Sequence, residues 1–441
     1  MKKLVLKGGF ICDPANGLEG IGDLVIYGHK IQEIIDTTKG TWSDDFEVVD
    51  AKGLIVMPGF IDLHTHLRDP GFVWKEDIKS GAIAASRGGF TTICAMPNTK
   101  PPPDSAPLVR DFFQRVADVQ IRIFPIGTIT KNRSGKNLSP MMALYESGVV
   151  GFSDDGDPVM DPKLMRQALL YSIDTGLPII NHAEDMNLKG SGVMNTGAVA
   201  DRLGLNGVLP SSEYLMVNRD IELALSTGGK IHIPHVSTKQ SVSYIKEAKS
   251  NGVNVSAEVT PQHLTMNENW VYGLHGDIPE HLTVDAYETN TKVNPPLRSQ
   301  NDVDALIQGL NEGVIDIVAT DHAPHSLADK QCSFDQAEAG INNIETAFCQ
   351  LYELVEGKKI ALGTLVSSMT EKPAKIIKKN FGTLSKNSIA DITVFDPNTS
   401  WLVHPKNLAS KSANTPLLGQ KLKGRIVLTL AEGKVIHNEL F

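Results

Sequence analysis

Short apolar runs alternate with longer, helix-like stretches from Gly59 to about residue 320. Each run is bounded by Gly, Pro or polar residues, and amphipathic stretches such as Met165–Thr175 and Val242–Ser250 lie between runs. This alternation predicts parallel βα units. The runs that we interpret as strands are residues 59–66, 91–97, 121–128, 149–154, 178–183, 230–236, 253–259 and 314–320. Eight such units predict an α/β fold, a closed (β/α)8 TIM barrel, which takes about 250 residues and more with insertions.

The two ends of the chain have a different pattern, of short strands and turns. Apolar and β-branched runs occupy Leu4–Cys12, Asp23–Ile35, Phe46–Val56, Ile389–Phe395 and Arg425–His437. A helical region at Ile344–Asn380 precedes the last two. We infer that the ends pair into one small β-sandwich domain of residues 1–57 and 385–441, beside a barrel domain of residues 58–384.

Composition and charge narrow the class of partner. The chain has 441 residues and a formal net charge of −9, which argues against nucleic acid and against an anionic membrane. No apolar run is long enough to span a bilayer, and the run after Met1 is too short for a signal peptide. The four cysteines are scattered, as free thiols of a reducing compartment are. We therefore expect a cytoplasmic protein in which an anionic substrate needs local positive charge.

The stretch Gly59–Gly71 carries the first candidate chemistry. It begins as an apolar strand and ends with His64, His66 and Arg68, which are spaced by two. Alternate side chains of an extended strand share a face. Two neutral imidazoles side by side are half of a zinc site, and an adjacent guanidinium binds anions. The pattern therefore predicts a metal site, provided that other strands supply the remaining ligands.

Polar side chains also follow the other predicted strands, at the ends where a barrel forms its site. The candidates are Asn98, Asp154, Asp155, His182, His235, Asp321 and His325. Four histidines and two aspartates at one mouth are a donor set that suits Zn²⁺.

Two of these positions have a rival close by in the sequence. His232 competes with His235, and we favour His235 because it lies nearer the strand end. Asp154 competes with Asp155, and strand parity does not separate them. An Asp-Asp-Gly sequence also suits a turn or a helix cap.

Other histidines are expected to be structural. His322 follows Asp321 directly and should point away from it. The long insertion of residues 261–313 contains His263, His275 and His281, which we expect at the surface.

Taken together, the motifs resemble those of the amidohydrolase superfamily and, within it, the bacterial type of the dihydroorotase family. The matching segments are Asp62–Gly71, Met96–Thr99, Phe152–Gly156, Asn181–Glu184, His235–Ser237, Val293–Arg298 and Ala319–His325. They run from the first predicted barrel strand to the last, and the terminal segments match the family's flanking β domain. His-x-His alone indicates only the superfamily. Arg-Asp-Pro-Gly and Asp-His-Ala-Pro-His narrow the resemblance to dihydroorotases.

The resemblance implies a set of metal ligands. One ion would be held by His64, His66 and Asp321, a second by His182 and His235, and Asp155 would lie between them. Many members of the superfamily have a carboxylated lysine at the bridging position. Here the first lysine after the fourth predicted strand is Lys163, and the branch that the chain resembles uses aspartate instead. The expected cofactor is Zn²⁺, with one or two ions per subunit.

The resemblance also implies a reaction and a set of substrate contacts. The reaction is the reversible cyclisation of N-carbamoyl-L-aspartate to L-dihydroorotate in de novo pyrimidine (UMP) biosynthesis. Asp321 would be the catalytic acid and base that carries a proton between water and the ring nitrogen. The substrate would contact His66, Arg68, Asn98, Asn294, His325 and the backbone of Ala339 and Gly340.

Two other functions are open to such a barrel. A hydantoinase or allantoinase would hydrolyse a different cyclic amide, but Arg68, Asn98 and Asp155 argue against it. A catalytically silent barrel would instead scaffold a partner such as aspartate transcarbamoylase, with which relatives associate. The complete ligand set argues against silence. We expect an active homo-oligomer, with that enzyme as a candidate partner.

Overall fold

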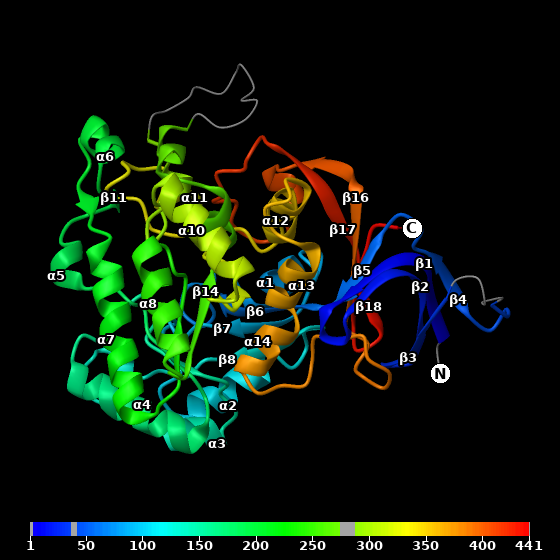
Figure 1. The fold of residues 1–441 in the computed structure, drawn as a ribbon, viewed down its shortest axis with the longest axis horizontal. Helices are drawn as coiled ribbons and strands as arrows, with labels where there is room; N and C mark the ends of the chain where they lie inside the picture. Colours follow the sequence, from blue (N-terminus) through cyan, green and yellow to red (C-terminus); the bar gives the residue numbers. More distant parts are fainter. Residues whose placement is uncertain (1–2, 37–41, 274–286, 441) are drawn as a thin grey trace.

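The computed structural model describes residues 3–36, 42–273 and 287–440. A ring of parallel strands surrounded by helices forms the larger part, and a β domain holding both chain ends forms the smaller part (Figure 1). The ring strands are β6 (Phe60–Thr65), β7 (Phe90–Ala95), β8 (Arg122–Pro125), β9 (Phe152–Ser153), β10 (Ile179–Ile180), β13 (Ile231–Ile233), β14 (Val255–Val259) and β15 (Ile317–Val318). Each corresponds to one predicted strand, so the strand prediction for the barrel is confirmed.

Two parallel sheets make up the ring. Strands β6, β7 and β8 form a 3-stranded sheet, and β9, β10, β13, β14 and β15 form a 5-stranded sheet. Isolated parallel bridges join these sheets on both sides, between Gly127 and Phe152 and between Thr65 and His322. Consecutive strands are therefore neighbours around the ring, as a (β/α)8 barrel requires.

Several barrel strands are shorter than the apolar runs that predicted them. Beyond three strand ends the backbone turns left-handed, with φ of 61° at Arg68, 32° at His235 and 48° at Asp321. Such a conformation costs a residue other than glycine about 1–3 kcal/mol and is found where the surroundings enforce it. Here it ends the strand pairing and redirects polar side chains at the barrel mouth.

Helix α4 (Pro162–Thr175) shows how the sequence specifies the outer layer. The Asp161 carboxylate accepts hydrogen bonds from the backbone N–H groups of Lys163 and Leu164, with Pro162 in the first turn. Its apolar face is buried, and Gly176 ends it in the left-handed conformation that a glycine adopts without strain. The amphipathic prediction for Met165–Thr175 is thus confirmed.

The remaining helices cover the ring and line its mouth. The outer helices are α1 (Ile78–Arg87), α2 (Ala106–Arg115), α3 (Met141–Glu146), α7 (Ser211–Thr227), α8 (Lys239–Ser250), α10 (Gln300–Asn311), α12 (Ala347–Glu356), α13 (Leu362–Met369) and α14 (Glu371–Ile376). Shorter insertions contain α5 (Met186–Lys189), β11 (Met194–Asn195), α6 (Ala198–Leu203), β12 (Gly207–Val208), α9 (Pro261–Thr265) and α11 (Leu327–Lys330). Single 3-10 turns occupy Pro14–Asn16, Lys131–Arg133, Glu268–Tyr272, Thr289–Thr291 and Pro405–Asn407.

The β domain is built from both ends of the chain, as predicted. Its strands are β1 (Lys3–Asp13), β2 (Leu18–Tyr27), β3 (Lys30–Ile35), β4 (Glu47–Asp50), β5 (Ile55–Pro58), β16 (Ile392–Leu402), β17 (Lys421–Ala431) and β18 (Lys434–Asn438). They form an 8-stranded sheet in the order β18-β17-β16-β5-β1-β2-β3, with β4 paired to β1. Strand β5 pairs antiparallel with β16, for example Val56 with Val394, which joins the two ends. Side chains from both halves, such as Ile26 and Leu428, share one small core.

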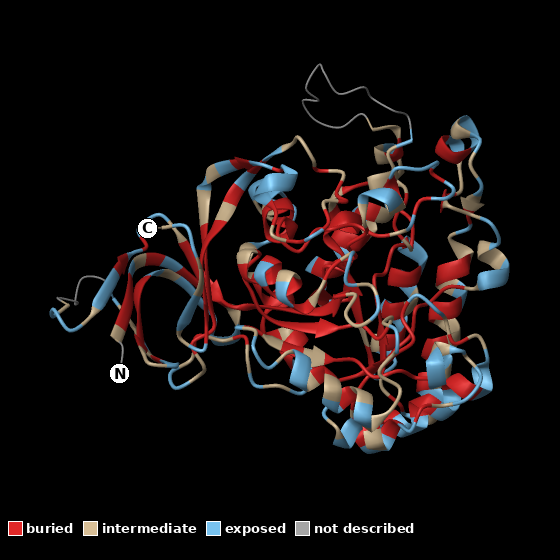
Figure 2. Cartoon of the chain, turned by 180° about the vertical axis from the view of Figure 1, so that it is seen from behind, coloured by how far each residue is buried: buried red, intermediate tan, exposed pale blue. Residues whose placement is uncertain are grey.

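Burial follows the same layers. The ring strands and the inner faces of the helices are buried, and the outer helix faces are exposed (Figure 2). All four cysteines are free thiols, and only Cys332 is exposed. Within the described ranges, no helix combines the length and apolarity needed to cross a membrane.

Candidate metal centre

Six side chains from five strand ends meet at the barrel mouth. They are His64 and His66 from β6, Asp155 after β9, His182 after β10, His235 after β13 and Asp321 after β15. Each is at most 5% exposed. The convergence predicted from the strand ends is therefore present in the structure.

The first group surrounds the end of β6. Nε2 of His64 lies 3.4 Å from Oδ1 of Asp155 and 3.5 Å from Oδ1 of Asp321. Nε2 of His66 lies 3.5 Å from Oδ2 of Asp155 and 2.9 Å from Oδ1 of Asp321. Ligand atoms about 2.0–2.1 Å from a tetrahedral zinc ion are separated by about 3.3 Å. These spacings therefore suit a shared cation.

A second group shares Asp155 with the first. Nδ1 of His182 and Nε2 of His235 each lie 3.8 Å from Oδ1 of Asp155. The two nitrogens are 2.9 Å apart. Asp155 thus stands between two histidine pairs and could ligate on either side.

Two buried atoms at this centre have no hydrogen-bond partner among the described residues, namely Nε2 of His64 and Oδ1 of Asp155. An unpaired buried polar atom costs about 1–3 kcal/mol. Nδ1 of His64 lies 2.6 Å from Oε1 of Glu258, so the ring donates Nδ1–H there and turns the lone pair of Nε2 toward Asp155. A divalent cation would satisfy both unpaired atoms, so the residues fit a metal site.

The electrostatic field favours the same conclusion. Burial by itself lowers the pKa of the His64 imidazole. The carboxylates of Asp155, Glu258 and Asp321 outweigh burial and raise that pKa well above its ordinary value. Positive charge is therefore favoured at the point where the first group converges.

Two carboxylates that the sequence reasoning did not single out orient the histidines. Glu258 accepts from Nδ1 of His64, and its Oε2 lies 3.0 Å from Nε2 of His232. Oε2 of Glu184 lies 3.3 Å from Nε2 of His182, so the lone pair of Nδ1 of that ring points toward the centre and could bind a metal ion. A carboxylate behind a histidine fixes its tautomer and raises its basicity as a ligand. The available signal for Glu258 was a charged residue inside an apolar strand, and Glu184 stood in the Asn181–Glu184 motif without a role.

The structure separates the two adjacent aspartates. Asp154 accepts hydrogen bonds from the backbone N–H groups of Ile129 (2.9 Å) and Thr130 (3.0 Å) and from the Thr130 hydroxyl. It therefore ties the β8 loop to the β9 loop, while Asp155 reaches the centre. Burial raises the pKa of Asp154 to about 6. Nη2 of Arg133 donates to the Asp155 carbonyl at 2.7 Å and fixes the backbone of the bridging residue.

The rival histidines lie outside the cluster. His232 bonds to Ser256 and Glu258, and Nε2 of His322 lies 3.6 Å from Glu76 in a buried position. The surface prediction for His263 is wrong. His263 lies on α9, and its buried ring contacts Thr260 and the Pro295 carbonyl. It is buried because α9 packs against the segment that contains Pro295 instead of projecting into solvent. His275 and His281 lie outside the described residues.

A hollow of about 280 Å³ opens at the centre. Every predicted substrate contact lines it, namely His66, Arg68, Asn98, Asn294, His325, Ala339 and Gly340. Oδ1 of Asn98 lies 2.9 Å from Nδ1 of His66, and Nδ2 of Asn294 donates to Glu184 at 3.0 Å. The polar groups proposed for the metal and for the substrate therefore share one cavity.

Arg68 is a half-buried cation that lines this hollow. Burial lowers the pKa of its guanidinium to about 10, so it remains charged at neutral pH. Burial, followed by the charges of Arg68 and Lys75, lowers the pKa of His325 and keeps that ring neutral. Nζ of Lys75 lies 3.1 Å from Nδ1 of His325, and Nε2 of that ring lies 3.0 Å from the Ala339 carbonyl oxygen and 3.1 Å from Nη2 of Arg68. The hollow thus offers an anion one fixed positive charge beside a neutral imidazole.

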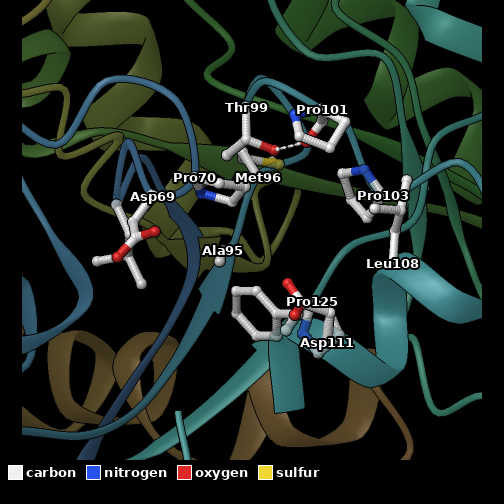
Figure 3. Close-up of a pocket in the computed structure, with 12 residues that line it drawn as sticks. Asp69, Pro70, Ala95, Met96, Thr99, Pro101, Pro103, Leu108, Asp111 and Pro125 are labelled. Carbon is white, nitrogen blue, oxygen red and sulfur yellow. Dashed lines mark hydrogen bonds between the residues drawn. The ribbon is translucent and has the colours of Figure 1, made fainter. Parts of the chain in front are cut away.

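A second hollow beside the mouth differs in chemistry. Pro70, Met96, Pro101 and Leu108 converge around a narrow space of about 20 Å³ (Figure 3). The Thr99 hydroxyl donates to the Pro101 carbonyl at 2.9 Å, within the segment that follows Asn98 (Figure 3). The lining residues include no histidine, so this wall supports the site rather than forming another metal centre.

Comparison with known proteins places the chain in a family. The model of the amidohydrolase family matches residues 55–436. The chain is 44% identical over 440 residues to a dihydroorotase from Aquifex aeolicus, covering 100% of both chains. It is 41% identical over 438 residues to a dihydroorotase from Syntrophus aciditrophicus, covering 99% of this chain and 100% of that one.

Solved structures support the fold. An L-hydantoinase (dihydropyrimidinase) from Arthrobacter aurescens has a TM-score of 0.85 and 24% identity, covering 100% of this chain and 97% of that one. A dihydropyrimidinase from Brevibacillus agri has a TM-score of 0.82 and 22% identity, covering 99% and 95%. At these identities the comparison supports only the fold, namely the barrel and its β domain.

Proposed function

Because this chain belongs to the amidohydrolase family and, within it, to the dihydroorotases, we propose that its buried His–Asp centre performs the reversible ring opening of L-dihydroorotate to N-carbamoyl-L-aspartate. The chain is a metal-dependent cyclic amidohydrolase. The observation that carries the assignment to this centre is one hollow that holds both the His–Asp cluster and the half-buried guanidinium of Arg68. A cyclic amide that bears a carboxylate requires both.

We assign the metal ligands by their position in the cluster. The first ion would be held by His64, His66 and Asp321, the second by His182 and His235, with Asp155 between them. Neutral imidazole and carboxylate donors suit Zn²⁺, and one or two ions per subunit are proposed. A bound divalent cation would supply Lewis acidity and an activated water at neutral pH.

We assign substrate binding and proton transfer to residues of the chain. Arg68 and Asn98 bind the ring carboxylate, and Asn294, His325 and the Ala339–Gly340 backbone hold the ring above the centre. Asp321, ionised and buried, accepts the proton of the attacking water and gives it to the departing ring nitrogen. In the cyclising direction the same carboxylate works in reverse. His66, 2.9 Å from Oδ1 of Asp321, orients that carboxylate between water and substrate.

The wider setting is part of the same proposal. We place the reaction in de novo pyrimidine biosynthesis and the protein in the cytoplasm, which agrees with its four free thiols. We propose a homo-oligomer, with aspartate transcarbamoylase as a candidate partner. We also retain the division into residues 1–57 plus 385–441 and residues 58–384.

A substrate comparison tests the function. Purified protein is assayed with L-dihydroorotate and with hydantoin, which has a cyclic amide but no ring carboxylate. We expect turnover of dihydroorotate at a kcat/KM at least about 100-fold above that for hydantoin, because Arg68 makes a charge-assisted bond only to the former. Equal or preferential turnover of hydantoin would overturn the proposal.

A further inference from the structure

Lys330, the last residue of α11, is a buried cation outside the metal centre. It is 4% exposed. Its Nζ donates to the carbonyls of Thr289 (3.1 Å), Lys292 (3.3 Å) and Glu338 (2.6 Å). An ammonium group has three N–H donors, so each has one acceptor. Within the described residues, all of these acceptors are main-chain carbonyls rather than carboxylates.

The three carbonyls belong to two segments that form one wall of the hollow. Residues 289–292 lead directly into Val293 and Asn294, and Glu338 precedes Ala339 and Gly340. All five of these flanking residues, Val293, Asn294, Glu338, Ala339 and Gly340, line the hollow. The Gly340 N–H also donates to the Lys292 carbonyl at 2.9 Å. The segments are distant in sequence and meet where the substrate ring would lie.

We propose that Lys330 is a positioning residue for substrate binding, whose ammonium group holds these two segments together so that Asn294 and the Ala339–Gly340 backbone present a fixed surface to the ring. This inference rests on the proposed function for its substrate. Loss of the ammonium group removes the donor that the three carbonyls share; the Thr289 and Lys292 carbonyls keep the N–H groups of Lys292 and Gly340, but the Glu338 carbonyl loses its tie to residues 289–292. The contact between the two segments is therefore weakened. Lys330 does not touch the reacting atoms, so its loss weakens binding more than turnover.

The charges around Lys330 add a pH dependence. Burial, followed by the charge of Lys292, lowers the pKa of its ammonium group to about 7, while Glu288, Glu338 and Asp329 oppose that shift. The charge of Lys330 in turn lowers the pKa of His325. As the pH rises through about 7, the amine keeps two N–H donors for three carbonyls. The wall therefore loosens on the alkaline side.

Steady-state kinetics with L-dihydroorotate test the proposal, using Lys330→Met and a matched control. The control is Lys230→Met, because Nζ of Lys230 donates to the Ile376 carbonyl at 3.0 Å at the opposite end of the barrel. Both variants lose a half-buried or buried lysine bound to carbonyl oxygen. We expect KM to rise about tenfold or more in Lys330→Met, with kcat within about threefold, and to stay within about twofold in Lys230→Met. The wild-type KM should rise above about pH 7, and this rise should be absent in Lys330→Met.

Amide hydrogen exchange supplies a readout that does not depend on turnover. Peptides covering residues 288–294 and 336–342 should exchange faster in Lys330→Met than in the wild type, with no change in Lys230→Met. Unchanged KM and unchanged exchange in Lys330→Met would refute the inference. If exchange is faster in Lys330→Met as expected but the wild-type protein does not turn over dihydroorotate, the proposed function is refuted instead. If Lys330→Met does not fold, Lys330→Arg replaces it in the test, because arginine keeps its charge across this pH range. The rise of KM above about pH 7 should then be absent in Lys330→Arg, and a rise equal to that of the wild type would refute the role of Lys330.

Discussion

Replacing Glu258 with glutamine tests how the chain orients its metal ligands. The carboxylate of Glu258 lies 2.6 Å from Nδ1 of His64 and 3.0 Å from Nε2 of His232. Glutamine has nearly the same shape but is neutral, with one acceptor and one donor end. The substitution therefore removes the charge behind His64 without creating a cavity.

The structure sets the expected magnitude. The amide N–H₂ of the glutamine would face His232, because that ring can shift its proton to Nδ1 and donate to the Ser256 hydroxyl 2.8 Å away. The amide oxygen then still accepts from His64, and only the charge assistance is lost. A hydrogen bond to a charged group is worth about 1.5–3 kcal/mol, against about 0.5–1.5 kcal/mol for a neutral one. A loss of about 1.4 kcal/mol lowers zinc affinity about tenfold, the lower end of the 10–100-fold typical for such partners.

Competition with a chromophoric chelator measures the zinc affinity, and turnover is measured at saturating zinc. Glu345→Gln is the matched control, since Glu345 is a buried carboxylate that accepts from the backbone N–H groups of Ala409 and Ser410 and is not one of the six converging residues. We expect zinc affinity to fall in Glu258→Gln and to remain unchanged in Glu345→Gln. An unchanged zinc affinity in Glu258→Gln would show that Glu258 does not orient His64 as a ligand.

Three further substitutions address the proton carrier, the anion site and a buried carboxylate. Asp321→Asn should keep the fold and lose at least about 100-fold in kcat, measured with dihydroorotate, and near-normal turnover would remove Asp321 from the proton transfer. Arg68→Ala should raise KM about 10–100-fold with a smaller change in kcat, and an unchanged KM would contradict its contact with the carboxylate. Burial raises the pKa of Glu345 from 4.5 to about 7, so its stabilising contribution is complete below pH 4.5 and is lost as the pH rises through 7. The Tm of the wild type minus that of Glu345→Gln should therefore decrease between about pH 5 and about pH 8, and a constant difference would contradict the shift.

The sequence was sufficient for the barrel and for the convergence of its polar residues. Apolar runs bounded by turn residues locate the strands, and parallel strands around a ring bring their carboxyl ends to one mouth. That geometry alone brings His64 near Asp321 despite their separation in sequence. The common strand pattern of the two chain ends predicted that they pair. In the structure, β5 from the first end pairs with β16 from the second.

The orientation of individual side chains was not predictable from pattern. Strand parity fails once the chain enters a turn, so only the contacts of Asp154 with the Thr130 loop separate it from Asp155. Glu258 was missed because its role depends on His64, which lies on β6, a strand that does not neighbour β14 in the ring. The burial of His263 depends on how an insertion folds back under Pro295, and periodicity holds no information about that packing.

If the six converging side chains hold a divalent cation on which dihydroorotate turnover depends, turnover must follow the amount of bound metal. Titration of Zn²⁺ into chelator-treated enzyme, with turnover followed at each addition, tests it most directly. We predict no turnover without metal and a rise that saturates at one or two equivalents per subunit. Full turnover of a preparation shown to contain no metal would contradict the account.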